Sequence, residues 1–376
     1  MRSSAQTPRL RACSAGRNRV PPDELLSIMA ISQAEHGRGR HAQEPSDIPA
    51  SGWRDILTRV KNEVGSDHIT LVAAGLSMCA LLAVFPGLAA AIAIYGLFAS
   101  PQNVVEHMQV FSNLLPPGTW DLFKTQLQTV ASQAQGSLTF AALGTLLIAL
   151  WSAKGGMSAL MTATNIAYAE PEKRGFFKQL LVSFAFTVGA IVGFLCVLAL
   201  GVAVPVAMKV LGTSDWVQVL VRVLRWVVLW VVVVLGLAVL YRYAPSRERA
   251  RWRWVTWGSA IAATLWLIVS VLFAWYVSSF ASYSKTYGAL GGMIALLMWF
   301  YLTSLAVLIG AEINSEMERQ TTRDTTEGPE VPLGQRGAYA ADTVGPTAQH
   351  APKAKEKEQA QGGPAIAERK RRRRKR

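Results

Sequence analysis

Six long apolar segments, each flanked by charged or turn-forming residues, constrain this chain more than any other feature. A membrane-spanning α-helix needs about 20 consecutive, mainly apolar residues, and each segment reaches or exceeds that length. The pattern therefore predicts an all-α, polytopic membrane protein built as a bundle of six transmembrane helices. The predicted spans cover residues 69–98, 138–168, 180–211, 217–243, 254–280 and 289–313.

The Lys and Arg residues of the connecting loops are distributed asymmetrically. Cytoplasmic loops are enriched in Lys and Arg, and this bias sets the orientation of the spans. One set of alternating connections holds only Lys124, Lys209, Arg222 and Lys285. The sequence therefore predicts that both termini are cytoplasmic. The basic residues on that side are Arg54, Arg59, Lys61, Lys173, Arg174, Lys178, Arg242, Arg247, Arg249, Arg251 and Arg253.

Polar segments flank the spans and divide the chain into three parts. Residues 53–318 form the predicted six-span domain, whereas residues 1–52 and 319–376 lack the apolar periodicity of a folded core. Because such segments bury too little apolar surface to fold alone, we expect a disordered N-terminal arm and a disordered cytoplasmic tail. The first 20 residues are rich in Arg and Ser and lack acids, as in an organellar transit peptide, and Met29 is an alternative start.

The predicted tail ends in a run of eight basic residues, which accounts for much of the formal net charge of +14. A cytoplasmic cluster of this kind is attracted to anionic headgroups by about 1 kcal/mol per charge. The same electrostatics would attract nucleic acid, which we do not expect as the partner, and a solvated tail without a ligand is the third interpretation. The run consists of Arg369, Lys370, Arg371, Arg372, Arg373, Arg374, Lys375 and Arg376.

The connection at residues 100–136 carries two apolar stripes at helical spacing, separated by Pro116, Pro117 and Gly118. This pattern predicts two short amphipathic helices on the outer side of the membrane. Two interpretations stay open. The helices pack on the bundle or at the membrane interface, or they form a lid over an outward-facing cavity.

Small residues and prolines mark two of the spans. Ala185, Gly189, Gly193, Gly201 and Pro205 form a stripe with four-residue spacing, which predicts close packing against a neighbouring helix. A proline inside a helix removes a backbone donor and bends the helix. Pro205, together with Pro86 of the first span, is therefore a predicted kink.

Signatures of catalysis are largely missing from the sequence. All five histidines lie outside the spans, and none stands at the spacing of a metal site. The three cysteines form no CxxC pair, and no nucleophile or phosphate-binding motif is present. We therefore expect no enzymatic activity, no metal and no cofactor.

Polar residues at membrane depth are the remaining candidates for a functional site. Ionisable side chains there are costly, so they face the bundle interior or a water-filled cavity. Lys154 lies near the middle of the second span, with Asn165 near its cytoplasmic end, and Glu312 and Asn314 lie at the matching end of the last span. We predict that Lys154 and Glu312 share a polar interior through bridging water, although Glu312 also fits a carboxylate that reaches the interface or caps a helix.

The same residues carry a resemblance to the YihY/BrkB family of bacterial inner-membrane proteins, which is named in part for a virulence factor and was once labelled ribonuclease BN. The similarity covers roughly residues 53–320. It implies a six-span bundle in the plasma membrane, without an established reaction. Met78, Cys79 and Lys154 depart from the expected pattern. The matching segments are LLAVFPG at 81–87, WSAKGGMSALMTATNIAY at 151–168, YRYAP at 241–245, YGALGG at 287–292, WFY at 299–301 and GAEINSEMER at 310–319.

Three classes of function compete at this point. The leading hypothesis is transport or export of a small or amphipathic solute, or envelope maintenance, based on the intramembrane Lys154 and the predicted broken helices. The alternatives are a non-transporting membrane scaffold and, more distantly, a membrane-associated ribonuclease. The expected partner is the lipid bilayer, and a homo-oligomer is compatible with the sequence.

Overall fold

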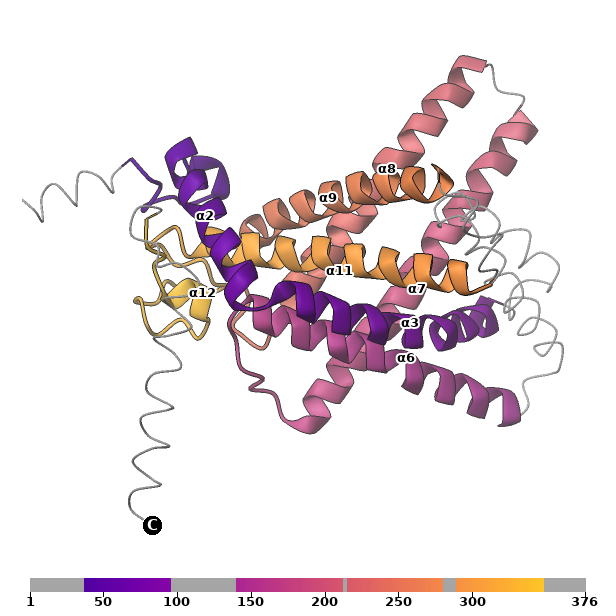
Figure 1. The fold of residues 1–376 in the computed structure, drawn as a ribbon, viewed down its shortest axis with the longest axis horizontal. Coiled ribbons are helices and arrows are strands. Elements are labelled where there is room, and N and C mark those ends of the chain that lie inside the picture. Colours follow the sequence, from indigo (N-terminus) through magenta and orange to yellow (C-terminus); the bar gives the residue numbers. More distant parts are fainter. Residues whose placement is uncertain (1–36, 96–139, 212–214, 280–288, 348–376) are drawn as a thin grey trace, which may run out of the picture.

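The computed structural model describes residues 37–95, 140–211, 215–279 and 289–347, and within these ranges the regular structure is helical (Figure 1). An isolated antiparallel bridge between Ala250 and Thr326 is the one strand-like pairing of the described residues. The helices are α2 (Ala50–Ser66), α3 (Ile69–Tyr95), α6 (Phe140–Ala167), α7 (Phe176–Leu211), α8 (Asp215–Tyr243), α9 (Trp252–Ser279), α11 (Ala289–Glu318) and α12 (Tyr339–Asp342), with a 3-10 turn η1 (Pro45–Asp47).

Six of these helices are long and apolar enough to cross a membrane, which confirms the predicted fold class. The last one, α11, continues to Glu318, beyond the predicted end at residue 313. The sequence turns polar there, but Glu316 and Glu318 have buried arginine partners that let the helix continue. The six apolar stretches are Ile69–Ala91, Leu146–Ala167, Phe176–Val197, Val223–Tyr243, Trp252–Ser278 and Gly291–Glu318.

The helices pack unevenly. The pairs α3–α6 and α9–α11 are in close contact, and α11 also packs against α3 to form the centre of the bundle. Helix α7 packs on α6 and α3, whereas α8 packs on α9. Along their described residues, α7 and α8 barely touch each other. The bundle therefore has one loosely closed side, between α7 and α8.

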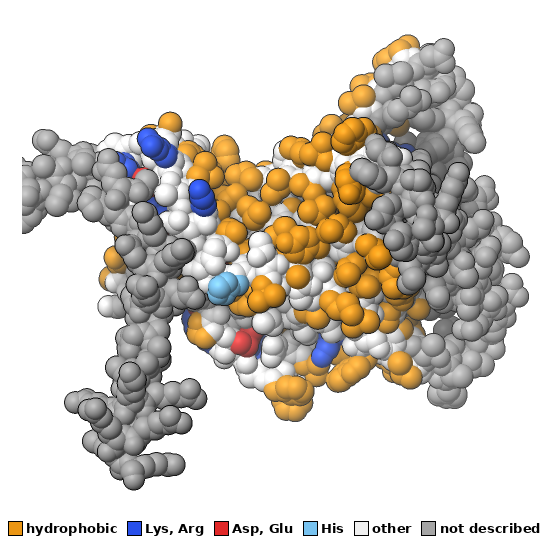
Figure 2. All heavy atoms as spheres, in the orientation of Figure 1, with side chains coloured by type: hydrophobic (Ala, Val, Ile, Leu, Met, Phe, Trp, Pro, Cys, Tyr) orange, Lys and Arg blue, Asp and Glu red, His pale blue; other side chains and the backbone are white. Residues whose placement is uncertain are grey.

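Small residues allow the close approach of the central helices. Ala73, Ala163, Ala262 and Ala311 are almost fully buried in the main apolar cluster. Packing of small residues is the usual way in which membrane helices associate, because lipid offers no hydrophobic driving force between them. Large apolar side chains instead cover the outside of the bundle, where they form the broad orange region of Figure 2. This surface is suited to contact with lipid tails.

Basic residues gather at one end of the bundle, which we call the basic end. Helix α2, the α6–α7 and α8–α9 connections and residues 319–347 all meet there, at the left of Figure 1. Because the first and last described residues both lie at this end, the chain enters and leaves the bundle on the same side.

The predicted disordered tail is wrong for residues 319–347. Arg336 is buried and donates hydrogen bonds to the backbone oxygens of Thr322, Arg323, Val331 and Ala341, at distances from 2.7 to 3.0 Å. Asp324 and Asp342 accept further hydrogen bonds within the segment. The segment is therefore held by polar contacts, which apolar periodicity does not reveal. The basic run at residues 369–376 lies outside the described residues.

The last part of the predicted N-terminal arm is also folded. Arg40 donates to the backbone oxygen of Gly345 at 2.8 Å, and Arg59 of α2 donates to that of Pro346 at 3.0 Å. Ala42 and Ile48 join a buried apolar cluster with Trp254. Residues 37–52 and 319–347, far apart in sequence, therefore form one layer across the basic end.

We expect the tail to contribute to stability up to residue 347. Ending the chain after Gly328 removes the backbone oxygens of Gly345 and Pro346, which accept hydrogen bonds from Arg40 and Arg59. Each lost hydrogen bond to a charged group is expected to cost about 1.5–3 kcal/mol. Ending the chain after Thr347 keeps both acceptors and is expected to leave stability unchanged. Thermal unfolding of the two purified truncations tests this. Equal unfolding temperatures would contradict the role of residues 329–347.

The structure describes the two prolines predicted to kink the spans, but not the two predicted outer helices. Pro86 lies inside α3 and Pro205 lies within the bounds of α7, and both helices continue past their proline. Kinking at either position stays a prediction. The two predicted amphipathic helices at residues 100–136 lie outside the described residues.

Candidate functional site: an apolar cavity with a basic rim

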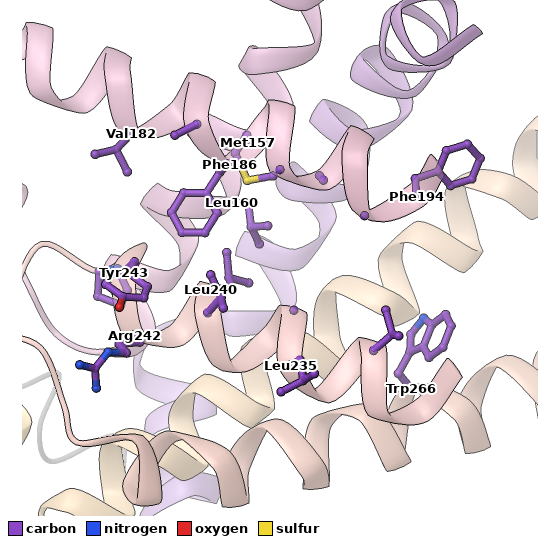
Figure 3. A pocket seen from close by; sticks show the side chains of 18 of the residues that line it. Met157, Leu160, Val182, Phe186, Phe194, Leu235, Leu240, Arg242, Tyr243 and Trp266 are labelled. Atoms are coloured by element: carbon purple, nitrogen blue, oxygen red, sulfur yellow. The ribbon is translucent and has the colours of Figure 1, made fainter. Parts of the chain in front are cut away.

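A large cavity occupies the space where α7 and α8 fail to pack. Its volume is about 1430 Å³, and its walls come from all six spanning helices. Figure 3 shows Arg242 and Tyr243 at one end of the cavity and Phe194 and Trp266 at the other. The cavity therefore runs from the basic end into the apolar body of the bundle.

The small-residue stripe of α7 forms one wall of the cavity. Ala185, Gly189 and Gly193 line it, and a Cβ atom added to either glycine would meet no atom within 4 Å. Gly236 of α8 also lines the cavity and has the same open space. The prediction that this stripe packs against a neighbouring helix is therefore wrong at Gly189 and Gly193. The missing side chains widen the cavity instead.

The walls present apolar surface because their polar groups are already hydrogen-bonded. Trp299 donates its indole N–H to Ser270 Oγ at 3.3 Å, and Trp266 donates to Thr303 Oγ1 at 3.2 Å. Between the ends of the cavity lie Leu160, Phe186 and Leu240 (Figure 3). An occupant of this region gains from apolar contact and finds few groups to hydrogen-bond.

The rim of the cavity at the basic end contains one acidic residue, Glu248, and six basic residues. The basic residues are Lys173, Arg174, Lys178, Arg242, Arg247 and Arg249. Four of the cations form ion pairs, with 2.5–2.8 Å between charged atoms: Lys173 with Glu170, Arg174 with Glu172, Arg242 with Glu327, and Arg247 with Glu318.

Lys178 and Arg249 are the two cations of the rim without a carboxylate partner among the described residues. The guanidinium of Arg249 lies 5.0 Å from the ring centre of Tyr243. Glu248 offsets one of these two charges. The rim therefore keeps an excess of one positive charge beside the apolar walls.

Two of the predicted site residues, Asn165 and Asn314, connect backbone segments. Asn165 Oδ1 accepts a hydrogen bond from Ser246 N at 2.8 Å, and its Nδ2 donates to Glu172 at 3.0 Å. Asn314 Oδ1 accepts from Gly258 N at 3.0 Å, and its Nδ2 donates to Val255 O at 3.3 Å. Asn165 thus ties the two loops of the rim together, and Asn314 ties α11 to α9.

Lys154 and Glu312 do not interact with each other among the described residues. Lys154 Nζ lies 4.8 Å from the ring centre of Trp151 on the same helix. Glu312 is 1% exposed, and its Oε1 has no hydrogen-bond partner within the described structure. Its strongest charged neighbours are Asp67, Glu316, Glu63 and Arg319. A functional role for either residue stays a prediction, but their pairing finds no support in this geometry.

Glu172 is held ionised by its neighbours. Its burial opposes ionisation, but hydrogen bonds from the side chain and backbone of Arg174 outweigh it and lower the pKa from 4.5 to about 2. A carboxylate with a depressed pKa stabilises the fold above its unfolded-state pKa, and the contribution is lost as the pH falls through the folded value. Glu172 therefore stabilises the rim at neutral pH.

We expect the stability difference between the wild type and Glu172→Gln to depend on pH. The wild type should be the more stable protein above about pH 4.5, and the difference should shrink as the pH falls towards 2. Thermal unfolding of both proteins across this range measures the difference. A constant difference from pH 6 to pH 3 would show that the charge of Glu172 does not stabilise the rim.

Sequence reasoning missed Lys178, Arg249 and Gly236 as residues of a site. The two cations were counted only for topology, since a sequence does not show which loop cations have ion-pair partners. Gly236 stands alone in a long run of Val and Leu, and an isolated glycine in an apolar helix was the available signal.

Comparison with known proteins places the chain in a family. The model of the family described as virulence factor BrkB matches residues 60–333. The chain belongs to this family.

Among the residues that the structure describes, no group of three or more His, Cys, Asp or Glu side chains is arranged to hold a metal ion.

Several bacterial proteins are similar to this chain in sequence. YfkH of Bacillus subtilis, whose name describes it as ribonuclease-like, is 36% identical over 197 residues, covering 51% of this chain and 70% of YfkH. A UPF0761 membrane protein of Vibrio campbellii is 27% identical over 302 residues (75% and 90%), and one of Aromatoleum aromaticum is 26% identical over 277 residues (72% and 65%). No solved structure matches the chain.

Proposed function

We propose that this BrkB-family protein transports or exports a small or amphipathic solute across the bacterial inner membrane. The cavity of about 1430 Å³ is the observation that carries the proposal. It exceeds the roughly 300–1,000 Å³ of typical small-molecule sites. Its location among the spanning helices fits a substrate path, because transporters commonly bind their substrates within the bundle.

Loss of the gene and occlusion of the cavity should have the same effect. A deletion strain is compared with the wild type for solutes and lipids that accumulate or disappear, and then complemented with Gly236→Leu. A Cβ atom added at Gly236 would meet no atom within 4 Å, so the variant should fold but fail to restore the normal profile. Full complementation by Gly236→Leu at normal protein level would contradict a path through this cavity.

The orientation of the bundle is part of the proposal. We place the basic end in the cytoplasm because cytoplasmic loops are enriched in Lys and Arg. A cysteine at Arg249 should react with impermeant thiol reagents only from the cytoplasmic side, and one at Gln126 only from outside. Labelling of the two positions in cells and in inverted vesicles measures this. The reverse pattern would overturn the orientation.

Ribonuclease activity is a second candidate, because the relative YfkH is named as ribonuclease-like. Incubation of the purified protein with labelled RNA, with and without divalent cations, tests it. RNA cleavage that copurifies with the protein, and that is lost when residues of this chain are substituted, would favour ribonuclease activity over transport.

A further inference from the structure

We propose that the cavity binds a membrane phospholipid with a singly charged anionic headgroup, and this assignment rests on the transport role proposed above. The headgroup lies at the basic rim beside Lys178 and Arg249, and the acyl chains lie along the apolar walls between α7 and α8. A phospholipid combines one small anionic group with a large apolar volume, which complements the cationic rim and the apolar walls of the cavity.

The dimensions of the apolar part suit an acyl chain. The wall of α8 extends from Trp226 to Tyr243, which is about 25 Å along the helix axis. A bilayer has a hydrocarbon core about 30 Å thick, so each leaflet contributes about half of that depth. The wall is therefore long enough for the full length of an acyl chain.

The cavity is open on the side where a lipid would enter. Leu235 and Val239 of α8 both line it, yet their exposed fractions are 59% and 40%. Side chains that line a cavity and are also half exposed lie at its open edge. Since α7 and α8 barely touch, a lipid can enter between them from the bilayer without first passing through water.

The charge of the rim favours an anionic headgroup over a zwitterionic one. Four of its cations are neutralised by Glu170, Glu172, Glu318 and Glu327. Of the remaining groups, Lys178 and Arg249 outnumber Glu248 by one charge. A phosphodiester such as that of phosphatidylglycerol carries the single negative charge that matches this excess.

Photocrosslinking tests the assignment. The full-length protein in vesicles is labelled with phosphatidylglycerol that carries a photoreactive acyl chain, and the modified peptides are mapped. Labelling should concentrate in α7 and α8 and should be displaced by unlabelled phosphatidylglycerol more effectively than by phosphatidylcholine. Labelling spread evenly over the lipid-facing helices would overturn the proposal.

Two variants separate the headgroup from the acyl chains. Lys178→Gln with Arg249→Gln should weaken the preference for the anionic lipid roughly thirtyfold, from the usual contribution of two cations near a membrane surface. Gly236→Leu should reduce labelling by both lipids, because it fills the apolar part. The matched control Arg54→Gln with Lys61→Gln removes the same charge from α2, away from the cavity, and should change neither result.

Competition experiments with the lipid probe distinguish a lipid headgroup from free phosphate and from a second copy of this chain. Displacement by inorganic phosphate as effective as that by the lipid would show a site for free phosphate and overturn the lipid assignment. If a second copy of this chain covers the edge between α7 and α8 and blocks its labelling by the lipid probe, the lipid assignment is also overturned. Transport is measured separately. Specific lipid labelling with no transport defect in Gly236→Leu refutes the proposed function alone, whereas a transport defect without lipid preference refutes the lipid alone.

Discussion

Replacing Glu318 with Gln is expected to destabilise the folded bundle by about 3–5 kcal/mol, the usual cost of removing one partner from a buried ion pair. Glu318 and Arg247 have fully buried side chains, and their charged atoms approach to 2.5 Å. Thr325 donates a further hydrogen bond to Glu318 at 2.9 Å. The substitution leaves the guanidinium of Arg247 buried against the ring of Tyr168 but without its carboxylate partner.

An exposed ion pair of the same protein provides the control for Glu318→Gln. The charged atoms of Arg253 and Glu44 approach to 2.8 Å, but their side chains are 43% and 51% exposed. Such a pair contributes roughly 0–1 kcal/mol, so Glu44→Gln should have little effect. Denaturant or thermal unfolding of the purified variants compares them. If Glu318→Gln lowers the free energy of unfolding no more than Glu44→Gln does, the buried pair of Arg247 and Glu318 does not stabilise the bundle more than the exposed pair.

Replacing both members of the buried pair tests the reason for the loss. A well-packed apolar pair is often as stable as a buried ion pair of similar volume. The double variant Arg247→Met with Glu318→Leu should therefore recover much of the stability lost in Glu318→Gln. If the double variant is less stable than Glu318→Gln, the loss comes from packing and not from the unpaired charge.

The second large effect is expected at Gly310, where alanine should destabilise the bundle by about 1–3 kcal/mol, the usual cost of overpacking. A Cβ atom there would overlap Ala262 of α9 and would lie 2.6 Å from the hydroxyl of Tyr241. The methyl group of Ala262 is fixed to its backbone and cannot turn away. Helices α9 and α11 would have to separate, and they form one of the closest contacts in the bundle.

Gly189→Ala is the matched control, because the space beside Gly189 is open. Alanine has the higher helix propensity by about 1 kcal/mol, so this variant should be as stable as the wild type or slightly more stable. The unfolding temperatures of Gly310→Ala and Gly189→Ala measure the contrast. Similar destabilisation in both would mean that α7 packs against a neighbour at Gly189.

The spans were predictable because crossing a bilayer depends on local properties. A run of about 20 apolar residues satisfies its backbone hydrogen bonds within one helix whatever its neighbours are. All six predicted spans are therefore helices of the structure. Their ends were less predictable, as at α11, which continues to Glu318 because arginines from distant parts of the chain pair with its carboxylates.

The tertiary structure alone decided what the small residues do. Gly258 and Gly310 allow close contact between α9 and α11, whereas Gly189 and Gly193 face open space, although all four are glycines in apolar helices. It also decided that Lys154 lies over Trp151 and that residues 319–347 fold against residues 37–52. These outcomes depend on contacts between residues up to about 300 positions apart, which neither composition nor periodicity records. Local sequence thus determined that six helices cross the membrane, and the packing between them decided where the bundle closes and where it stays open.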